Sequence, residues 1–236
     1  MNLAFIGFSV AGVIFAVYAY TFYSLAGAKL PVFLKNYAFA YFSLALAFLI
    51  WAFAALNNSF LVNSVIIGNI LLLLGSIFLL KVLFNNSKNT KILSIFLGVI
   101  LSLIFLWVRI NYYQPTPFML NGILIFNTQR IVAEILGLIF AFVWLPANLL
   151  VAKKVSATTG IQGMSFVYSF IYILSTVSAI LFISVSTVSM VIASFVTLSL
   201  CFVMLIYSNY VINKISSEDI RKNVPKKPAG ATASRQ

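Results

Sequence analysis

The sequence predicts an all-α integral membrane protein, built as a seven-transmembrane-helix bundle with a short β-hairpin between the fourth and fifth helices. Of its 236 residues, 63% are hydrophobic and only 8% are charged, and the mean hydropathy is +1.10. Soluble domains are about 45–50% apolar and about 25% charged, so a water-soluble fold is excluded. At about 20 apolar residues per crossing, this length leaves no room for a sizeable domain outside the membrane.

Seven apolar runs, separated by polar clusters, are each long enough to cross a bilayer as a helix. Helices are expected rather than a barrel because the runs lack the alternation of barrel strands. We divide the chain into a transmembrane domain, residues 1–212, and a basic tail, residues 213–236, which we expect to be disordered in the cytoplasm. The runs cover residues 3–25, 37–56, 61–84, 92–110, 130–152, 166–185 and 188–212.

The basic residues predict the orientation of these seven spans. All of the 15 Lys and Arg residues except Arg109 and Arg130 fall on one side of a seven-span chain. Because Lys and Arg concentrate on the cytoplasmic side, the amino terminus is expected outside a cell membrane and the carboxyl terminus inside. Topology thus accounts for the net charge of +12. We do not expect nucleic-acid binding, because the chain offers no folded basic surface in water.

The composition also argues against catalysis and metal binding. The chain has no histidine, and its three acidic residues are Glu134, Glu218 and Asp219. Its one cysteine, Cys201, lies in an apolar run and has no internal disulfide partner. Motifs of nucleotide-binding loops, zinc proteases and serine hydrolases are absent. We therefore expect a protein that is not an enzyme and that holds no cofactor.

Residues 111–129 form an external insert between the fourth and fifth runs. Two apolar arms within it, which begin at Phe118 and end at Phe126, flank the dipeptide Asn121-Gly122. Asn-Gly favours the positive φ angles of a two-residue hairpin turn, so a β-hairpin is predicted on the external face. Arms this apolar should rest on the bundle, the membrane or another protein. A lid on its own bundle and a surface for a ligand or partner both remain open.

Glu134 is the one carboxylate within an apolar run, and Arg130 precedes it by one helical turn. The i, i+4 spacing predicts an ion pair on one helix face, with Arg109 as an alternative partner. Ionisable groups within a membrane often mark a proton or ligand site. An interfacial pair that reaches water is the interpretation that we favour here, since both residues lie near the start of the span.

Asn69 in the third run and Asn148 in the fifth are strong amides in apolar surroundings. Such side chains normally form hydrogen bonds between helices, and Pro146 frees a carbonyl that a neighbour must satisfy. Alternatively, Asn69 and Asn148 line a polar cavity. Lys81, near the inner end of the third run, is expected to extend its ammonium to the headgroups.

Aromatic and small residues give further expectations about packing. Trp51, Trp107 and Trp144 fall near predicted span ends, where Trp usually anchors a protein at the membrane interface. Gly12 and Gly68 belong to pairs of small residues four apart, which permit close approach of helices within the bundle or in an oligomer.

Two functional hypotheses follow from these features. The first is a sensor-like or receptor-like module, or an accessory subunit of a membrane complex, that binds a ligand or partner near the external face. A membrane-protein partner or a second copy of the chain is the expected partner, besides the lipid bilayer. The second is a small transporter or channel with a polar route near Asn69, Glu134 and Asn148. The depth of Glu134 discriminates between them, because a carboxylate at mid-membrane favours transport and an interfacial one favours binding.

Overall fold

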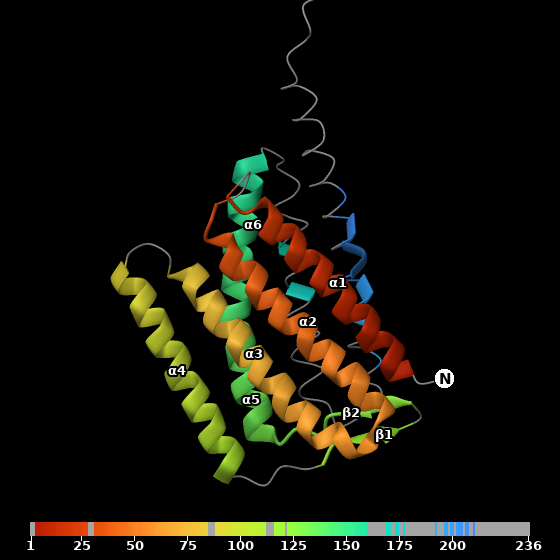
Figure 1. The fold of residues 1–236 in the computed structure, drawn as a ribbon. Helices are drawn as coiled ribbons and strands as arrows, with labels where there is room; N and C mark the ends of the chain where they lie inside the picture. The colour runs from red at the N-terminus through yellow and green to blue at the C-terminus, as the bar shows by residue number, and fades with distance from the viewer. Residues whose placement is uncertain are drawn as a thin grey trace, which may run out of the picture.

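The structure is a computed structural model that describes residues 3–27, 31–84, 88–111, 116–120 and 122–159, together with scattered helical residues between 169 and 210. It is mostly helical and has a small two-stranded sheet (Figure 1). The elements are α1 (Leu3–Leu25), α2 (Leu34–Leu56), the short 3₁₀ helix η1 (Asn58–Phe60), α3 (Leu61–Leu83), α4 (Lys88–Asn111), β1 (Phe118–Leu120), β2 (Ile123–Ile125), α5 (Arg130–Ile139), the π-helical segment η2 (Phe140–Trp144) and α6 (Leu145–Thr159).

Four helical stretches within the described residues are long and apolar enough to cross a membrane. They are Ala4–Leu25, Leu34–Leu56, Leu61–Leu83 and Arg130–Ala157. A shorter apolar stretch, Ile92–Val108, lies within α4. Because a bilayer core takes about 20 helical residues, these stretches indicate a membrane protein.

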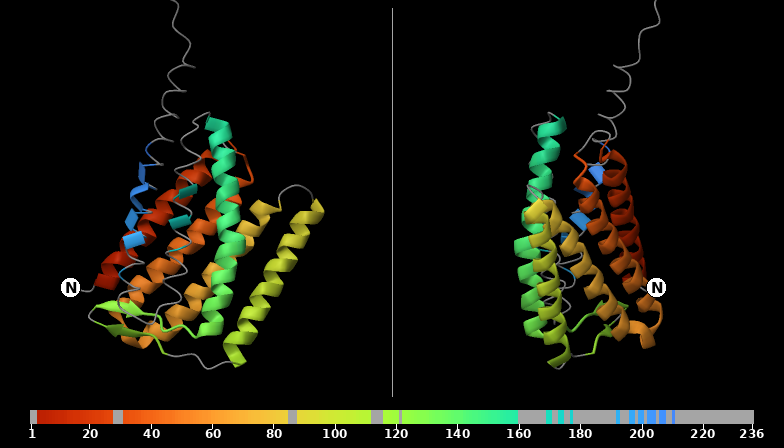
Figure 2. Two further views of the ribbon diagram at one scale, coloured as in Figure 1. Left: turned by 180° about the vertical axis from the view of Figure 1, so that it is seen from behind. Right: turned by 60° about the vertical axis from the view of Figure 1, so that its left-hand side comes forward.

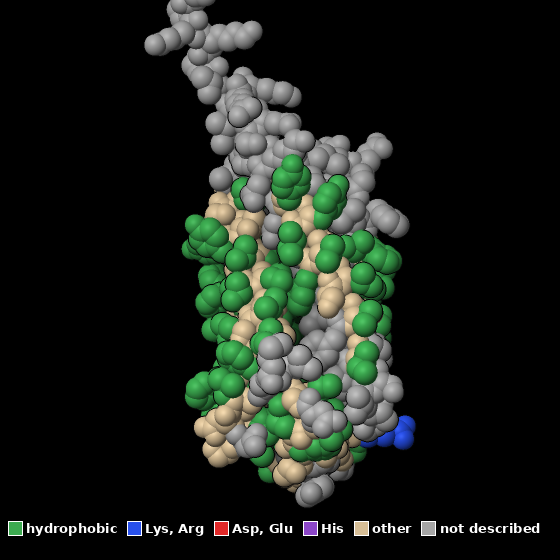
Figure 3. Space-filling model, turned by 90° about the vertical axis from the view of Figure 1, so that its right-hand side faces the viewer, with side chains coloured by type: hydrophobic (Ala, Val, Ile, Leu, Met, Phe, Trp, Pro, Cys, Tyr) green, Lys and Arg blue, Asp and Glu red, His purple; other side chains and the backbone are tan. Residues whose placement is uncertain are grey.

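The helices pack mainly against their neighbours in the sequence. α1 lies against α2, and α2 lies against α3; on its other sides α3 contacts α4 and the continuous rod formed by η2 and α6 (Figures 1 and 2). α4 stands at the edge of the bundle, where it contacts α3 and α5. Figure 3 shows apolar side chains along the height of the face that it presents, as expected of a surface that meets lipid.

The two ends of the bundle differ in chemistry. At one end, which we call the hairpin end, β1 and β2 lie beside the start of α1, where the Ala4 N–H donates a 2.9 Å hydrogen bond to the Gly122 carbonyl (Figure 1). At the opposite end, which we call the lysine end, α2 begins and α3 and α6 finish. The lysine end carries Lys35, Lys81, Lys153 and Lys154 in these helices, and α4 begins there with Lys88 and Lys91 in its first turn.

The interface of α1 and α2 has a core of aromatic rings packed in tilted and edge-to-face pairs. The Tyr18 and Tyr37 hydroxyls are 3.0 Å apart and share a hydrogen bond, and the ring centroids of Tyr37 and Tyr41 are 4.8 Å apart. Phe202, a described helical residue of the seventh predicted run, places its ring 5.3 Å from that of Phe15 on α1. The remainder of the sixth and seventh runs, and the tail from 213, lie largely or wholly outside the described residues.

The expectation that the tryptophans anchor the protein at the membrane interface is wrong for two of them. Trp51 and Trp144 are buried, with 6% and 3% of their surface exposed. The Trp51 indole N–H donates to the Ser64 carbonyl at 3.2 Å, and the Trp144 indole N–H donates to Ser76 Oγ at 2.8 Å. Trp107, near the end of α4, is exposed, and its interfacial position stays a prediction.

Glycines make room for these buried indoles. A Cβ atom on Gly68 would collide with the indole of Trp51, and one on Gly75 would lie 3.1 Å from Cζ2 of Trp144. A Cβ atom on Gly12 would lie 2.7 Å from the Leu49 side chain across the α1–α2 contact. The small residues at positions 12 and 68 therefore serve contacts inside the bundle.

The fifth predicted run is part of a longer helix that contains a π-helical turn. α5, η2 and α6 continue from Arg130 to Thr159, past the predicted end at residue 152. Within η2 the Leu145 N–H donates to the Phe140 carbonyl, five residues back. Pro146 follows directly, and its missing N–H and its ring disrupt regular α-helical bonding at this point. The wider turn lets the helix pass Pro146 without ending.

Candidate functional site

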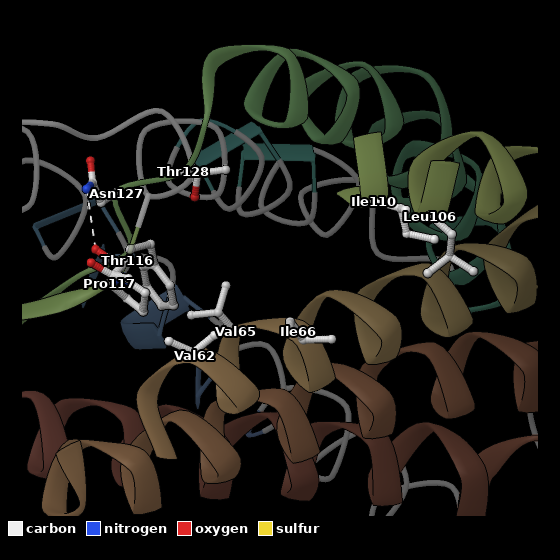
Figure 4. Close-up of a pocket in the computed structure, with 10 residues that line it drawn as sticks. Val62, Val65, Ile66, Leu106, Ile110, Thr116, Pro117, Asn127 and Thr128 are labelled. Carbon is white, nitrogen blue, oxygen red and sulfur yellow. Dashed lines mark hydrogen bonds between the residues drawn. The ribbon is translucent and has the colours of Figure 1, made fainter. Parts of the chain in front are cut away.

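A cavity of about 250 Å³ lies at the hairpin end, between α3, α4 and the segments on either side of the β-hairpin (Figure 4). α3 and α4 contribute branched aliphatic side chains, whereas the segments next to the hairpin contribute hydroxyl and amide groups. The wall is therefore apolar on the helical side and uncharged but polar at the rim. The lining residues are Val62, Val65, Ile66, Leu106, Ile110, Thr116, Pro117, Phe126, Asn127 and Thr128.

The rim of the cavity is held by a strained asparagine. Asn127 has a φ angle of +47°, a left-handed conformation that Asn adopts more easily than most residues. Its side-chain Nδ2 donates to the Thr116 carbonyl at 3.3 Å, which ties the segment after β2 to the segment before β1 (Figure 4). This bond closes the loop around the hairpin and fixes the polar wall of the cavity.

The hairpin itself is formed by antiparallel pairing of β1 and β2. Phe118 pairs with Ile125, and Leu120 pairs with Ile123. Gly122 has a φ angle of +79°, which suits a tight turn; Asn121 lies outside the described residues. The register therefore leaves the two residues 121 and 122 as the connection, in agreement with the Asn-Gly pattern.

The two strands of the hairpin differ in burial. On the side of β2, Leu124, Ile125 and the following Phe126 are buried in the bundle. The Phe126 ring centroid lies 5.0 Å from that of Trp51 in an edge-to-face arrangement. On β1, Phe118 remains 44% exposed. One strand thus packs on the bundle as a lid would, while the other offers an apolar surface.

The ion pair between Arg130 and Glu134 forms within one turn at the start of α5. Arg130 Nε donates to Glu134 Oε1 at 2.7 Å, and the two side chains are 91% and 58% exposed. Glu134 is therefore not buried inside the bundle. The side chain of Arg109, the alternative partner, lies outside the described residues.

The structure does not bring the proposed polar route together within the described residues. Asn148 is buried and its Oδ1 accepts a 3.1 Å hydrogen bond from the Tyr41 hydroxyl, which joins α6 to α2. Glu134 lies about 20 Å away from Asn148 along the axis of the same helix. Asn69 on α3 is buried too, but none of the three lines the cavity at the hairpin end.

Sequence reasoning missed the cavity and one polar residue beside it. Gln129, which directly precedes α5 and follows Thr128 of the cavity wall, has a buried Oε1 atom without a hydrogen-bond partner in the described part of the chain. No periodicity or motif indicates a space between α3 and α4. The uncommon positive φ at Asn127 has one sequence signal, the preference of Asn for that conformation, but this signal alone is weak.

Comparisons with known proteins add no further constraint. No family model matches the chain, and no curated protein and no solved structure matches it.

Proposed function

We propose that the chain is a non-enzymatic membrane protein that binds a small apolar ligand at the hairpin end, as a sensor-like or receptor-like module or as an accessory subunit of a membrane complex. The observation that carries this proposal is the cavity between α3, α4 and the hairpin segments. Its volume of about 250 Å³ lies just below the roughly 300–1,000 Å³ of common ligand pockets. Its occupant is therefore small, largely hydrocarbon, and equipped with a hydrogen-bonding group for Thr116, Asn127 or Thr128.

The position of Glu134 also favours binding over transport. An ion pair with both side chains exposed, at the start of a span, is what an interfacial pair requires. A proton carrier would need this carboxylate among the buried polar groups, and in the described part of the chain those groups lie elsewhere.

The proposal includes seven spans, with the hairpin end outside the cell membrane and the lysine end in the cytoplasm. The helix order supports this orientation, because Lys35, Lys81, Lys153 and Lys154 all belong to one end. A tag inserted at residues 121 and 122 should be accessible in intact cells, and a tag after Gln236 should be protected. Both tags on the same side would contradict the seven-span topology.

A small transporter or channel is the second candidate function, and one observation favours it. The π-helical segment η2 joins the end of α5 to the start of α6 and contains the buried Trp144, and such segments often occur at functional sites. In this alternative, η2 and the Tyr41–Asn148 pair would rearrange to admit a substrate.

The ligand proposal is tested by purification from the native membrane in mild detergent, followed by identification of retained small molecules and proteins. Wild type should retain a small apolar molecule. Ile66→Phe should lose it, because the larger ring fills the cavity. Ile70→Phe is the matched control, since Ile70 lies one turn further along α3, is 48% exposed and does not line the cavity.

The outcomes separate the candidate functions. Equal retention by wild type and Ile66→Phe would contradict the cavity as the binding site. A co-purified membrane protein that depends on Phe118 would indicate an accessory subunit, because this apolar side chain is exposed on β1. A homo-oligomer would appear as a stable assembly of the chain alone.

A further inference from the structure

A row of three aromatic rings crosses α1, α2 and α3 at the lysine end, and a lysine stacks on each end of it. The Tyr23 ring centroid lies 5.7 Å from that of Phe39, which in turn lies 5.5 Å from that of Phe78. The Lys35 ammonium lies 5.4 Å from the Tyr23 centroid, and the Lys81 ammonium lies 5.2 Å from the Phe78 centroid. The rings thus hold two cations at defined places on the bundle surface.

An apolar groove of about 240 Å³ opens between α1 and α2 beside this row. Tyr23 and Phe39 belong to both features, so Lys35 stands at the lysine end of the groove. From Tyr23 to Ala16, α1 covers about 10 Å along its axis, and the groove follows it toward the middle of the bundle. The other lining residues are Ala19, Tyr20, Ala38 and Phe42.

Neither lysine is neutralised by an acid in the described part of the chain. The one carboxylate there, Glu134, is paired with Arg130 at the hairpin end. Within the described residues, the two ammonium groups therefore add positive charge that no carboxylate offsets where the apolar surface ends. An anion that reaches this position gains both Coulomb attraction and hydrogen bonds from the ammonium.

We propose that this surface binds an anionic phospholipid of the leaflet at the lysine end. The phosphate lies against Lys35, and one acyl chain occupies the groove between α1 and α2. The combination of a cation at the mouth and hydrocarbon along the wall matches a molecule with an anionic head and an apolar tail. A soluble phosphate would gain nothing from the apolar wall.

The headgroup part of the proposal is tested by native mass spectrometry of the full chain with added phosphatidylglycerol or phosphatidylcholine of identical acyl chains. Wild type should bind phosphatidylglycerol in preference. Lys35→Gln should lower phosphatidylglycerol binding about five-fold, as expected for one lysine near a charged headgroup. It should lower phosphatidylcholine binding less, because the choline cation of that lipid offsets the attraction between its phosphate and a lysine. Lys153→Gln is the matched control, because it removes the same charge at the same end from an exposed position away from the groove.

The acyl-chain part is tested by filling the groove. Ala16→Phe should lower the binding of both lipids, whereas Val13→Phe, on an exposed position of α1 outside the groove, should not. Lys35→Arg keeps the charge and should retain the preference, which separates loss of charge from misfolding. Equal losses in Lys35→Gln and Lys153→Gln would overturn the proposal, since general surface charge would then explain the preference. No headgroup preference in wild type would overturn it as well, since Lys35 would then not select an anionic lipid.

Discussion

The two sides of α3 are packed in opposite ways. Toward α2, Gly68 lies so close to Trp51 that any side chain there would collide with the indole, and the Trp51 N–H donates to the Ser64 carbonyl of α3. Toward α4, branched side chains such as Ile66 face a cavity of about 250 Å³. The difference shows that one helix can supply both a rigid contact and an accessible space, with the space at the hairpin end.

The distance between α3 and α4 increases from the lysine end toward the hairpin end. The two helices approach closely near the lysine half, where a Cβ atom on Gly98 would lie 2.6 Å from Cγ1 of Ile77. Further toward the hairpin end, Leu106 and Ile110 of α4 no longer close on α3, and the cavity lies between them. The residues before and after the hairpin complete the wall, so the cavity depends on the hairpin as well as on the two helices.

The largest expected effect concerns the close contact between α3 and α2. Gly68→Leu should destabilise the protein by about 3 kcal/mol or more, because the new side chain overlaps the Trp51 indole and forces α2 away from α3. The measurement is the thermal unfolding midpoint of the purified protein in detergent.

A matched glycine tests whether this effect is specific to the contact. Apart from the backbone of its own helix, no atom of the described residues lies within 4 Å of the place that a Cβ on Gly137 would occupy. Gly137→Leu should therefore leave the unfolding midpoint close to that of wild type. Equal destabilisation by the two substitutions would mean that neither α3 nor α5 tolerates a leucine in place of its glycine, and the contrast between the tight and the open position would fail.

The next effect concerns the hairpin, whose neighbouring segments form part of the cavity on the α4 side of α3. Gly122→Val should cost about 1–3 kcal/mol, because a β-branched residue resists the φ of +79° at this turn. Since the segments next to the hairpin form the polar wall of the cavity, ligand retention should fall as well. Gly122→Asn is the control and should cost less, as Asn accepts positive φ. Equal stability of wild type and Gly122→Val would argue for another turn conformation.

The sequence was informative where the signal is local. Apolar length predicts the helices, and α1 begins and ends at the residues of the first predicted run. The Asn121-Gly122 pattern predicts strands around residue 122, and the spacing of Arg130 and Glu134 predicts their ion pair. Each of these features depends on residues within a few positions of one another.

The tertiary contacts were not predictable in the same way. Trp51 and Trp144 lie near the ends of predicted runs, so the sequence favours an interfacial position for both. Their burial depends on Gly68 and Gly75 of another helix, which leave space for the indoles. Likewise, the cavity depends on the path of α4 relative to α3, which no pattern within either helix encodes. Site residues that meet only in space, such as Ile66 and Asn127, were therefore missed.

A smaller effect is expected from the buried hydrogen bond that joins α2 to α6. Tyr41→Phe should cost about 0.5–2 kcal/mol, because Asn148 Oδ1 loses its hydroxyl donor in a buried place. Tyr20→Phe, at an exposed position of α1, should leave the unfolding midpoint unchanged. If both variants behave like wild type, the Tyr41–Asn148 bond does not contribute to holding the bundle together.

The smallest effect on stability is expected at Glu134, which lies outside the closely packed contacts. The same residue also discriminates between a binding protein and a transporter. The Arg130–Glu134 pair is 91% and 58% exposed, and at the interfacial position that we propose for it, water screens the two charges and keeps their contribution small. Glu134→Gln should therefore leave both the unfolding midpoint and any proton movement unchanged, whereas Tyr41→Phe should lower the unfolding midpoint. Reconstitution in liposomes with an internal pH-sensitive dye provides the second measurement, and Arg130→Gln serves as a control for loss of the pair alone. A proton flux in wild type that persists in Arg130→Gln but disappears in Glu134→Gln would make Glu134 a proton carrier, since glutamine cannot titrate, and would favour the transporter over the binding protein.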